Sequence, residues 1–199
     1  MKRLTAAMLV MASLFGAQTA SAVDFNVRII NLTNGIYYTP FLVAAHPAGT
    51  SIFTVGQPAS ANLQAMAEGG DISGLVSDLD GLGATIAENP AGGLLAPASE
   101  TNVDLNTDGT SNELLTIVSM LLPTNDAFAG LNAVPIPTEP GTYVFDVPAY
   151  DAGTEANDEL LTGGGAPGAA GMPADPGGLT GTGGTGAAMA DANPNVHIH

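Results

Sequence analysis

The stretch ELLTIVSMLL, residues 113–122, is the most apolar run of the chain after its N-terminal segment, and it decides the fold class. A continuous apolar run of this length is typical of a strand buried on both faces, although a buried helix fits the same pattern. Turn-forming residues follow directly in PTNDAFAG, residues 123–130. We therefore expect residues 113–122 to form a central strand of a sheet.

Shorter segments on both sides of this run also have strand character. Residues 25–32 alternate with a period of two, which places Phe25, Val27 and Ile29 on one face of a half-buried strand. Further short strands are expected at 41–45, 51–55, 84–87, 101–105, 142–147 and 196–199. Many short strands separated by Gly and Pro turns predict an all-β sandwich.

Two short helices are expected in one connection of this sandwich. Apolar residues recur at helical spacing from Pro58 to Glu68, and Gly69-Gly70 would end that helix. Residues 72–79 can form a second helix, with Asp71 as its cap.

The N-terminus has the three parts of a secretory signal. Lys2 and Arg3 precede an apolar run over residues 4–17, and Ala20-Ser21-Ala22 is a typical cleavage site. We expect a signal peptide over 1–22, a single domain over 23–199, and a secreted or periplasmic protein without a membrane span after cleavage. Within that domain, residues 163–186 contain 11 Gly and should form a flexible loop.

The charge of the chain limits its partners. It carries 3 Lys and Arg against 19 Asp and Glu, for a net charge of −16, and Arg28 is the one base left after signal cleavage. Nucleic-acid binding is therefore not expected, because phosphate contacts need clustered Lys and Arg. With no Cys, the chain has no disulfides and no thiolate metal ligands.

Two acidic loops at the ends of predicted strands are candidate cation sites. Asp126 follows the central strand, and the segment YDAGTEANDE, residues 150–159, places four carboxylates in nine positions. Calcium prefers such oxygen ligands, so Asp126, Asp151 and Glu155 could form a site together. The alternative is that these carboxylates only cap turns and solvate loops.

Several segments in the same order resemble the spondin N-terminal domain family, in particular its bacterial exported members. The resemblance covers roughly residues 25–159. It is densest in SMLLPTNDAFAGLN (119–132) and PAYDAGTEANDE (148–159), with support from NLTNG (31–35), FLVAAHPAG (41–49) and FTVGQPAS (53–60).

The resemblance implies a C2-like antiparallel β-sandwich that binds one calcium ion at a loop end. Asp126, Asp151 and Glu155 match the family's metal-binding acids residue by residue. Two positions depart from the animal pattern, because Ala127 stands where that pattern has Trp, and Glu155 where it has Asp. The first departure puts in doubt any partner contact made by that aromatic side chain.

We therefore expect an exported, calcium-binding, non-catalytic module that binds an extracellular glycan or surface protein. No catalytic motif is present, so no enzyme activity is expected. The alternative is a transition-metal protein or metalloenzyme built on His46, His197 and His199. A weaker calcium-loop pattern at residues 104–109 is better explained as a hairpin turn, because position twelve is Leu115 rather than Glu.

Overall fold

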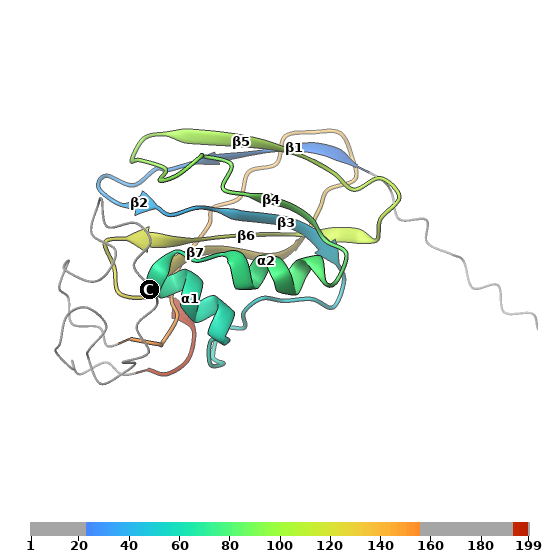
Figure 1. Ribbon diagram of the computed structural model, residues 1–199. Coiled ribbons are helices and arrows are strands. Elements are labelled where there is room, and N and C mark those ends of the chain that lie inside the picture. The colour runs from blue at the N-terminus through green and yellow to red at the C-terminus, as the bar shows by residue number, and fades with distance from the viewer. Residues whose placement is uncertain (1–22, 156–192, 199) are drawn as a thin grey trace, which may run out of the picture.

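The computed structural model describes residues 23–155 and 193–198. The predicted signal peptide, 1–22, and the predicted flexible loop, 163–186, lie outside these residues. The described residues form an antiparallel sandwich-like fold with two short helices, so the predicted all-β class is confirmed (Figure 1).

Strand β6 (Asn112–Leu122) runs through the larger sheet, as the sequence predicts. It pairs antiparallel with β3 (Leu42–Pro47) on one side and with β7 (Ala127–Pro135) on the other. Its last eight residues are all buried, because both faces of this strand are covered. The sheet has the order β4-β3-β6-β7-β8-β9, and β2 also pairs with β6. The remaining strands are β2 (Tyr37–Tyr38), β4 (Thr85–Glu88), β8 (Ala149–Asp151) and β9 (His197–Ile198).

A two-stranded sheet covers one face of the larger sheet. It consists of β1 (Asp24–Ile30) and β5 (Glu100–Asn106), paired antiparallel. The predicted alternation in β1 is confirmed, since Val27 packs inward with Leu105 against Ile117 of β6. Figure 1 shows this sheet on the opposite side of β3 and β6 from the helices.

The helices cover the other face. They are α1 (Ala61–Gly69) and α2 (Ser73–Asp80), and they pack against alternate residues of β6. Helix α1 begins three residues after Pro58, because the Ser60 side chain caps it by accepting the Leu63 N–H at 3.1 Å. It ends at Gly70, which adopts a left-handed conformation with φ 70°. None of the helices in residues 23–155 and 193–198 is long and apolar enough to cross a membrane.

Two predicted strands are wrong. Residues 51–55 and 142–147 have strand composition, but neither segment pairs with a neighbouring strand. Three strands were not predicted, namely β2, β7 and β8, because the first and last are very short and β7 begins with small residues. A polar turn is present near residues 104–109, with Asn106 Oδ1 accepting the Asp108 N–H at 2.7 Å. The expectation of a hairpin is wrong, because the strands it joins, β5 and β6, belong to different sheets.

Candidate functional site

Asp126 lies in the tight turn that joins β6 to β7. The Thr124 hydroxyl donates to the Leu121 carbonyl at 2.6 Å and accepts the Ala127 N–H at 3.2 Å, which closes the turn. This turn places Asp126 immediately before β7, where its side chain is buried with 1% exposure. The sequence-based expectation of an acid on a loop at the end of the central strand is therefore confirmed.

Asp151 ends the neighbouring strand β8 and lies beside Asp126. Its strand partner is Ala127, the residue after Asp126, and the Ala152 N–H donates to the Asp126 carbonyl at 3.2 Å. Asp151 is also buried, and its Oδ1 accepts the Gly153 N–H at 2.7 Å. Pairing of β7 with β8 thus brings together two acids that lie 25 positions apart in the sequence.

The segment after β8 wraps around the Asp126 carboxylate. One oxygen, Oδ2, accepts the Thr154 N–H at 2.7 Å, the Thr154 hydroxyl at 3.2 Å and the Glu155 N–H at 3.0 Å. Glu155 is 5% exposed, so all three acids predicted as metal ligands are buried at one end of the sheet. The contacts made by Thr154 had no signal in the sequence beyond its place after Gly153.

Burial and crowding oppose the charge of Asp126. Burial raises the pKa of its carboxyl above the ordinary value, and the neighbouring Asp151 charge raises this pKa further. The hydrogen bonds from Thr154 and Glu155 lower the pKa, but they do not cancel the increase. Two buried carboxylates therefore repel one another here, which is the situation that a bound cation relieves.

The positive charge of Arg28 does not compensate these two acids. Arg28 is the one Lys or Arg in residues 23–199, and it pairs with Glu100 on the smaller sheet. His197 is nearer, with its Nδ1 3.7 Å from Asp151 Oδ1, and it comes from β9, which pairs with β8. Among the described residues no group of three or more His, Asp and Glu side chains is arranged as a metal site.

The C-terminal segment packs closely on the loop that carries Asp151. Val196 is fully buried, and it exchanges backbone hydrogen bonds with Gly56 and Gln57 at 2.7 and 2.9 Å. Gly153 leaves no room for a side chain, because an added Cβ would lie 2.6 Å from the Asn193 carbonyl oxygen. The sequence predicted the last strand, but it did not predict that this strand lies beside the acidic loop.

His46 does not join the other histidines. It is fully buried on β3, and β6, β7 and β8 separate that strand from the β9 strand of His197. Both of its ring nitrogens have partners, Nδ1 with the Pro47 carbonyl at 3.1 Å and Nε2 with the Thr116 hydroxyl at 2.7 Å. His199 lies outside the described residues. The structure therefore gives no support to a site that combines His46 with His197.

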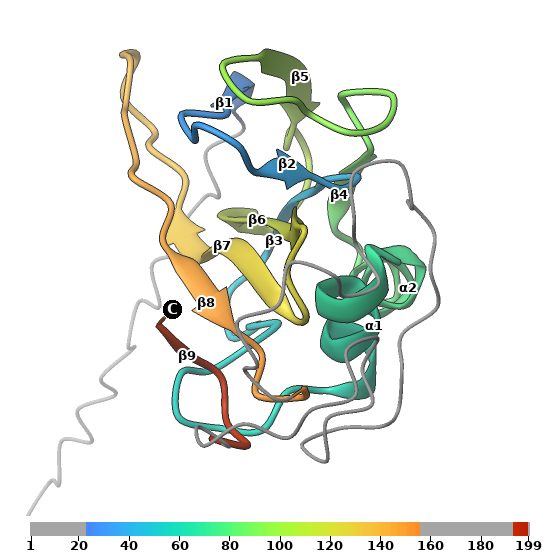
Figure 2. The same ribbon diagram turned by 90° about the vertical axis from the view of Figure 1, so that its left-hand side faces the viewer.

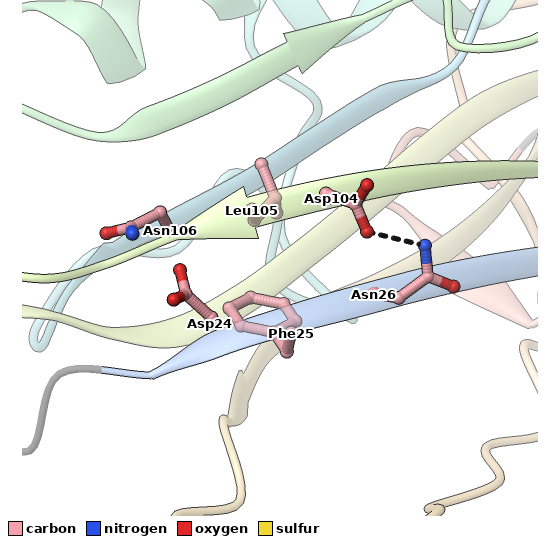
Figure 3. Close-up of a pocket in the computed structure, with 6 residues that line it drawn as sticks. All are labelled: Asp24, Phe25, Asn26, Asp104, Leu105 and Asn106. Carbon is pink, nitrogen blue, oxygen red and sulfur yellow. Dashed lines mark hydrogen bonds between the residues drawn. The ribbon is translucent and has the colours of Figure 1, made fainter.

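A separate pocket lies on the smaller sheet, away from the three acids. Figure 3 shows a shallow pocket on the smaller sheet, where Asp24, Phe25 and Asn26 face Asp104, Leu105 and Asn106. The Asn26 amide donates to Asp104 Oδ1 at 2.9 Å across the strands. This pocket contains none of the three candidate ligands, and it has no contact with the loops that carry them.

Comparison with models of known protein families gives a match. A family model described as Spondin_N matches residues 28–159. The matched range contains both acidic loops and every strand from β2 to β8, whereas β9 follows it. No curated protein matches the chain.

Proposed function

This chain belongs to the spondin N-terminal domain family, and from that premise we propose that it is an exported, non-catalytic module that binds one calcium ion through Asp126, Asp151 and Glu155. Membership of this family indicates an extracellular domain. Secretion or export to the periplasm fits cleavage after Ala22, which intact-mass measurement of the exported protein would test.

One observation carries the calcium proposal. Asp126 and Asp151 are each 1% exposed and close enough for one charge to raise the pKa of the other carboxyl. Burial of two neighbouring carboxylates is costly, and Arg28, the one Lys or Arg in residues 23–199, pairs with Glu100 on the smaller sheet instead. A divalent cation would remove this cost. The donor set fits calcium, because it consists of carboxylates with backbone carbonyls nearby, and calcium takes six to eight oxygen ligands.

A bound calcium ion would supply positive charge and a link between two connections. Asp126 belongs to the connection that follows β6, whereas Asp151 and Glu155 belong to the one that follows β8. The chain itself already aligns these acids through the β7–β8 pairing and the hydrogen bonds of Thr154 and Glu155 to Asp126. The resulting rigid end of the sheet is the surface we assign to partner binding.

Thermal melting tests the cation. The midpoint should be measured in EDTA, calcium, magnesium and zinc at matched ionic strength. We expect calcium to stabilise the folded protein by about 2.7 kcal/mol at a hundredfold excess over Kd. Asp126→Asn should abolish this increase and should also stabilise the metal-free protein, because it removes one of two repelling charges while keeping an oxygen for the three donors. Asp151→Asn should abolish the calcium increase as well.

A matched control separates a site from general screening. Asp108→Asn removes an equal charge from an exposed turn, so it should leave the calcium response intact. If the three variants respond alike, or if zinc stabilises and calcium does not, the proposed site is wrong.

The partner is proposed more coarsely, as an extracellular glycan or surface protein in adhesion. This proposal rests on family membership and on the rigid acidic end of the sheet. Binding to glycan arrays and to surface-protein extracts should be compared in calcium and in EDTA. If binding is equal in both conditions, or if Asp126→Asn leaves it unchanged, the partner is recognised independently of the calcium site.

A further inference from the structure

The connection between β7 and β8 extends away from the rest of the protein. We call residues 137–148 the arm, and Figure 2 shows it on the side opposite to the helices. Four large apolar side chains are exposed on the arm: Tyr143 at 49%, Val144 at 86%, Phe145 at 42% and Val147 at 42%. Apolar side chains exposed together in this way mark a surface that another surface covers.

The arm leaves the sheet where the pairing of β7 with β8 stops. The ladder reaches Ala129 and Ala149, and the Gly130 N–H then donates to the Pro148 carbonyl at 3.2 Å. Over residues 131–135, β7 has no neighbouring strand on the side away from β6 in the described part of the chain. An unpaired strand edge presents backbone groups with which another extended segment can pair. This free edge of β7 lies directly next to the arm.

The composition of the arm suits that edge. Its segment TYVFDV, residues 142–147, has the β-branched and aromatic residues that are typical of a strand. In an extended segment Tyr143, Phe145 and Val147 share one face, because side chains alternate along a strand. Ala149 of β8 follows at the next alternate position, and it packs against the sheet. The apolar face of the arm therefore continues the inward face of β8.

The register of β7 decides which residues would meet if the ladder continued. One step beyond the last hydrogen bond, Leu131 comes opposite Val147. Strand β7 then has one extra residue, because Leu131 and Val134 pair with residues of β6 that are only two positions apart. A bulge of this kind places two residues opposite one on a partner strand. When the extra residue is counted, Val134 comes opposite Phe145.

With this register, apolar residues meet at every inward position. The pairs are Leu131 with Val147, Val134 with Phe145, and Ile136 with Tyr143. Leu131 and Ile136 belong to the apolar cluster between the two sheets, and Val134 packs against it. Aromatic and β-branched residues that lie opposite one another stabilise adjacent strands. A register shifted by one residue would turn the apolar side chains of the arm to the other face.

We propose that the arm folds back onto the free edge of β7, so that β8 becomes one strand over residues 143–151 and residues 137–142 form the hairpin loop. The loop sequence PTEPGT has the Pro and Gly residues of a turn. The closed arm would fill the groove beside this edge, which is lined by β7, by the loop 51–55 and by Pro148 at the base of the arm. The arm is thus a strap with two positions. The open position exposes the groove and the apolar patch, and the closed position covers both.

Charge and size do not oppose this closure. The two acids on the arm are Glu139, in the hairpin loop, and Asp146, which comes opposite the bulge residues Asn132 and Ala133. Neither bulge residue is charged, and none of the residues that line the groove is Asp, Glu, Lys or Arg. The arm is attached to both strands. Its closure therefore loses no translational freedom, and it needs no interface of the size that two separate proteins require.

Hydrogen exchange of the unmodified protein tests the closed position. The Gly130 N–H donates to Pro148. Such positions alternate in an antiparallel ladder, so the N–H groups of Asp146 and Val144 also point towards β7. We expect these two amides to exchange about tenfold or more slowly than in an unfolded chain, whereas the Phe145 amide exchanges fast. If Asp146 and Phe145 exchange equally, or if the protection increases with protein concentration as in a contact between two molecules, the proposal is wrong.

Two neighbouring substitutions distinguish the apolar face of the arm from its other face. Phe145→Ser removes a side chain that faces Val134 in the closed position, and Val144→Ser removes one from the opposite face. Both changes leave the charge of the arm unaltered. We expect Phe145→Ser to abolish the protection of the Asp146 amide and Val144→Ser to retain most of it. An equal loss in both variants would overturn the proposed register, and unchanged exchange of the β6 amides shows that both variants are folded.

An engineered disulfide tests the register directly, because the chain has no Cys. In the closed position Pro135 comes opposite Val144, and both residues are exposed, so Cys at these two positions leaves the apolar face intact. The control pair is Pro135→Cys with Thr142→Cys. This pair encloses a shorter loop, and it should close at least as fast if the arm is unstructured. We expect the first pair to oxidise about tenfold faster, because disulfides need closely opposed positions. Equal rates, or a faster control, would reject the strap.

Discussion

Gly153 shows how one residue without a side chain joins the acidic loop to the C-terminal segment. Its φ is +71°, a conformation that costs other residues about 1–2 kcal/mol. An added Cβ would also lie 2.6 Å from Asn193 O and 2.7 Å from Asn195 N. The requirement for glycine at this position is therefore both conformational and steric.

We predict that Gly153→Ala destabilises the protein by more than its φ alone explains. The matched control is Gly109→Ala, which has the same backbone strain, with φ +72°, but no atom within 4 Å of the added Cβ. Denaturant unfolding of both variants isolates the steric part. Hydrogen exchange of Val196 and His197 should increase only in Gly153→Ala. If both variants lose the same stability, the close packing of the C-terminal segment contributes little.

Asn31 begins the formal glycosylation sequon Asn31-Leu32-Thr33, yet the structure gives its side chain another role. It is fully buried, and its amide donates to the carbonyls of Ile36 at 2.8 Å and Leu95 at 3.1 Å. Its Oδ1 accepts the Thr33 N–H and hydroxyl at 3.0 and 2.7 Å. A glycan would be attached to the Asn31 amide nitrogen, so it would have to disrupt the hydrogen bonds that this nitrogen donates to Ile36 and Leu95.

Asn31→Asp is expected to destabilise the fold by roughly 1–3 kcal/mol, because two buried carbonyls lose their donor. The same exchange at the exposed Asn102 should have little effect. Chemical denaturation measures both variants. An unchanged midpoint in Asn31→Asp would contradict the importance of these hydrogen bonds.

At the scale of single elements, helix α2 depends on an acid that precedes it. Asp71 Oδ1 accepts the Ser73 N–H at 2.9 Å. Hydrogen bonding to the Ser73 side chain, and then to this N–H, lowers the pKa of the exposed Asp71 carboxyl below its ordinary value. A lowered pKa means that the folded state favours the ionised carboxylate. Its contribution is therefore present above the unfolded pKa, and it is lost as the pH falls through the folded pKa.

The N-cap position of α2 is Ile72, without a side-chain cap bond, and Asp71 acts one residue earlier by accepting the Ser73 N–H. We predict that Asp71→Ala destabilises the protein by about 0.5–1 kcal/mol at neutral pH, a loss similar to that of a helix cap. Asp71→Asn keeps the acceptor without the charge, so it should lose less. Melting between pH 7 and pH 2.5 should show the difference between Asp71→Ala and the parent disappearing in the acid range. A difference that persists at the lowest pH would exclude the ionised carboxylate as its source.

The bulge in β7 depends on one hydroxyl between two strands. Thr116 Oγ1 accepts the Ala133 N–H at 2.9 Å and contacts His46 Nε2 at 2.7 Å, and both His46 and Thr116 are fully buried. Thr116→Val keeps the shape but leaves the Ala133 N–H and the His46 ring without this partner. We expect a loss of about 2–6 kcal/mol, from two polar groups at about 1–3 kcal/mol each. Thr116→Ser keeps the hydroxyl and should be milder, and denaturant unfolding compares the two.

The strands themselves show which patterns in the sequence predict structure. Strand β6 was predicted because its apolar run is long and has turn residues on both sides. Residues 142–147 have an equally good strand composition, but a strand also needs a neighbour, and the bulge at Ala133 removes it. Strand β7 was missed because its first residues, Ala127 to Gly130, include small side chains with low β-propensity. Composition therefore identified the segments that could form strands, and pairing with a neighbouring strand decided which of them did.

At the scale of the whole molecule, the sequence predicted the three acids of the candidate site but not its surroundings. Asp126, Asp151 and Glu155 could be proposed because two acidic loops follow predicted strands and because these three positions match the metal-binding acids of the family. The approach of His197 to Asp151 could not be predicted, because it depends on β9 pairing with β8 across a separation of more than forty residues. Contacts of that range follow from the whole topology rather than from any local pattern.

The charge balance of the chain leads to a last prediction, on salt. In residues 23–199 one Arg opposes 19 Asp and Glu, which leaves a formal charge of −18. Repulsion among these charges destabilises the folded protein, and most of it acts between exposed groups that salt can screen. The Debye length falls from about 30 Å at 0.01 M salt to about 8 Å at 0.15 M. We therefore expect the melting midpoint in EDTA to rise with NaCl, most steeply below about 0.2 M. At pH 3 the rise should be much smaller, because many carboxylates are then protonated.

Calcium should add a further increase in the melting midpoint that saturates at low concentration and is absent in Asp126→Asn. If NaCl reproduces the whole calcium effect, the acids act only as a diffuse charge, and the ordered site at the end of β6 and β8 does not bind a specific ion.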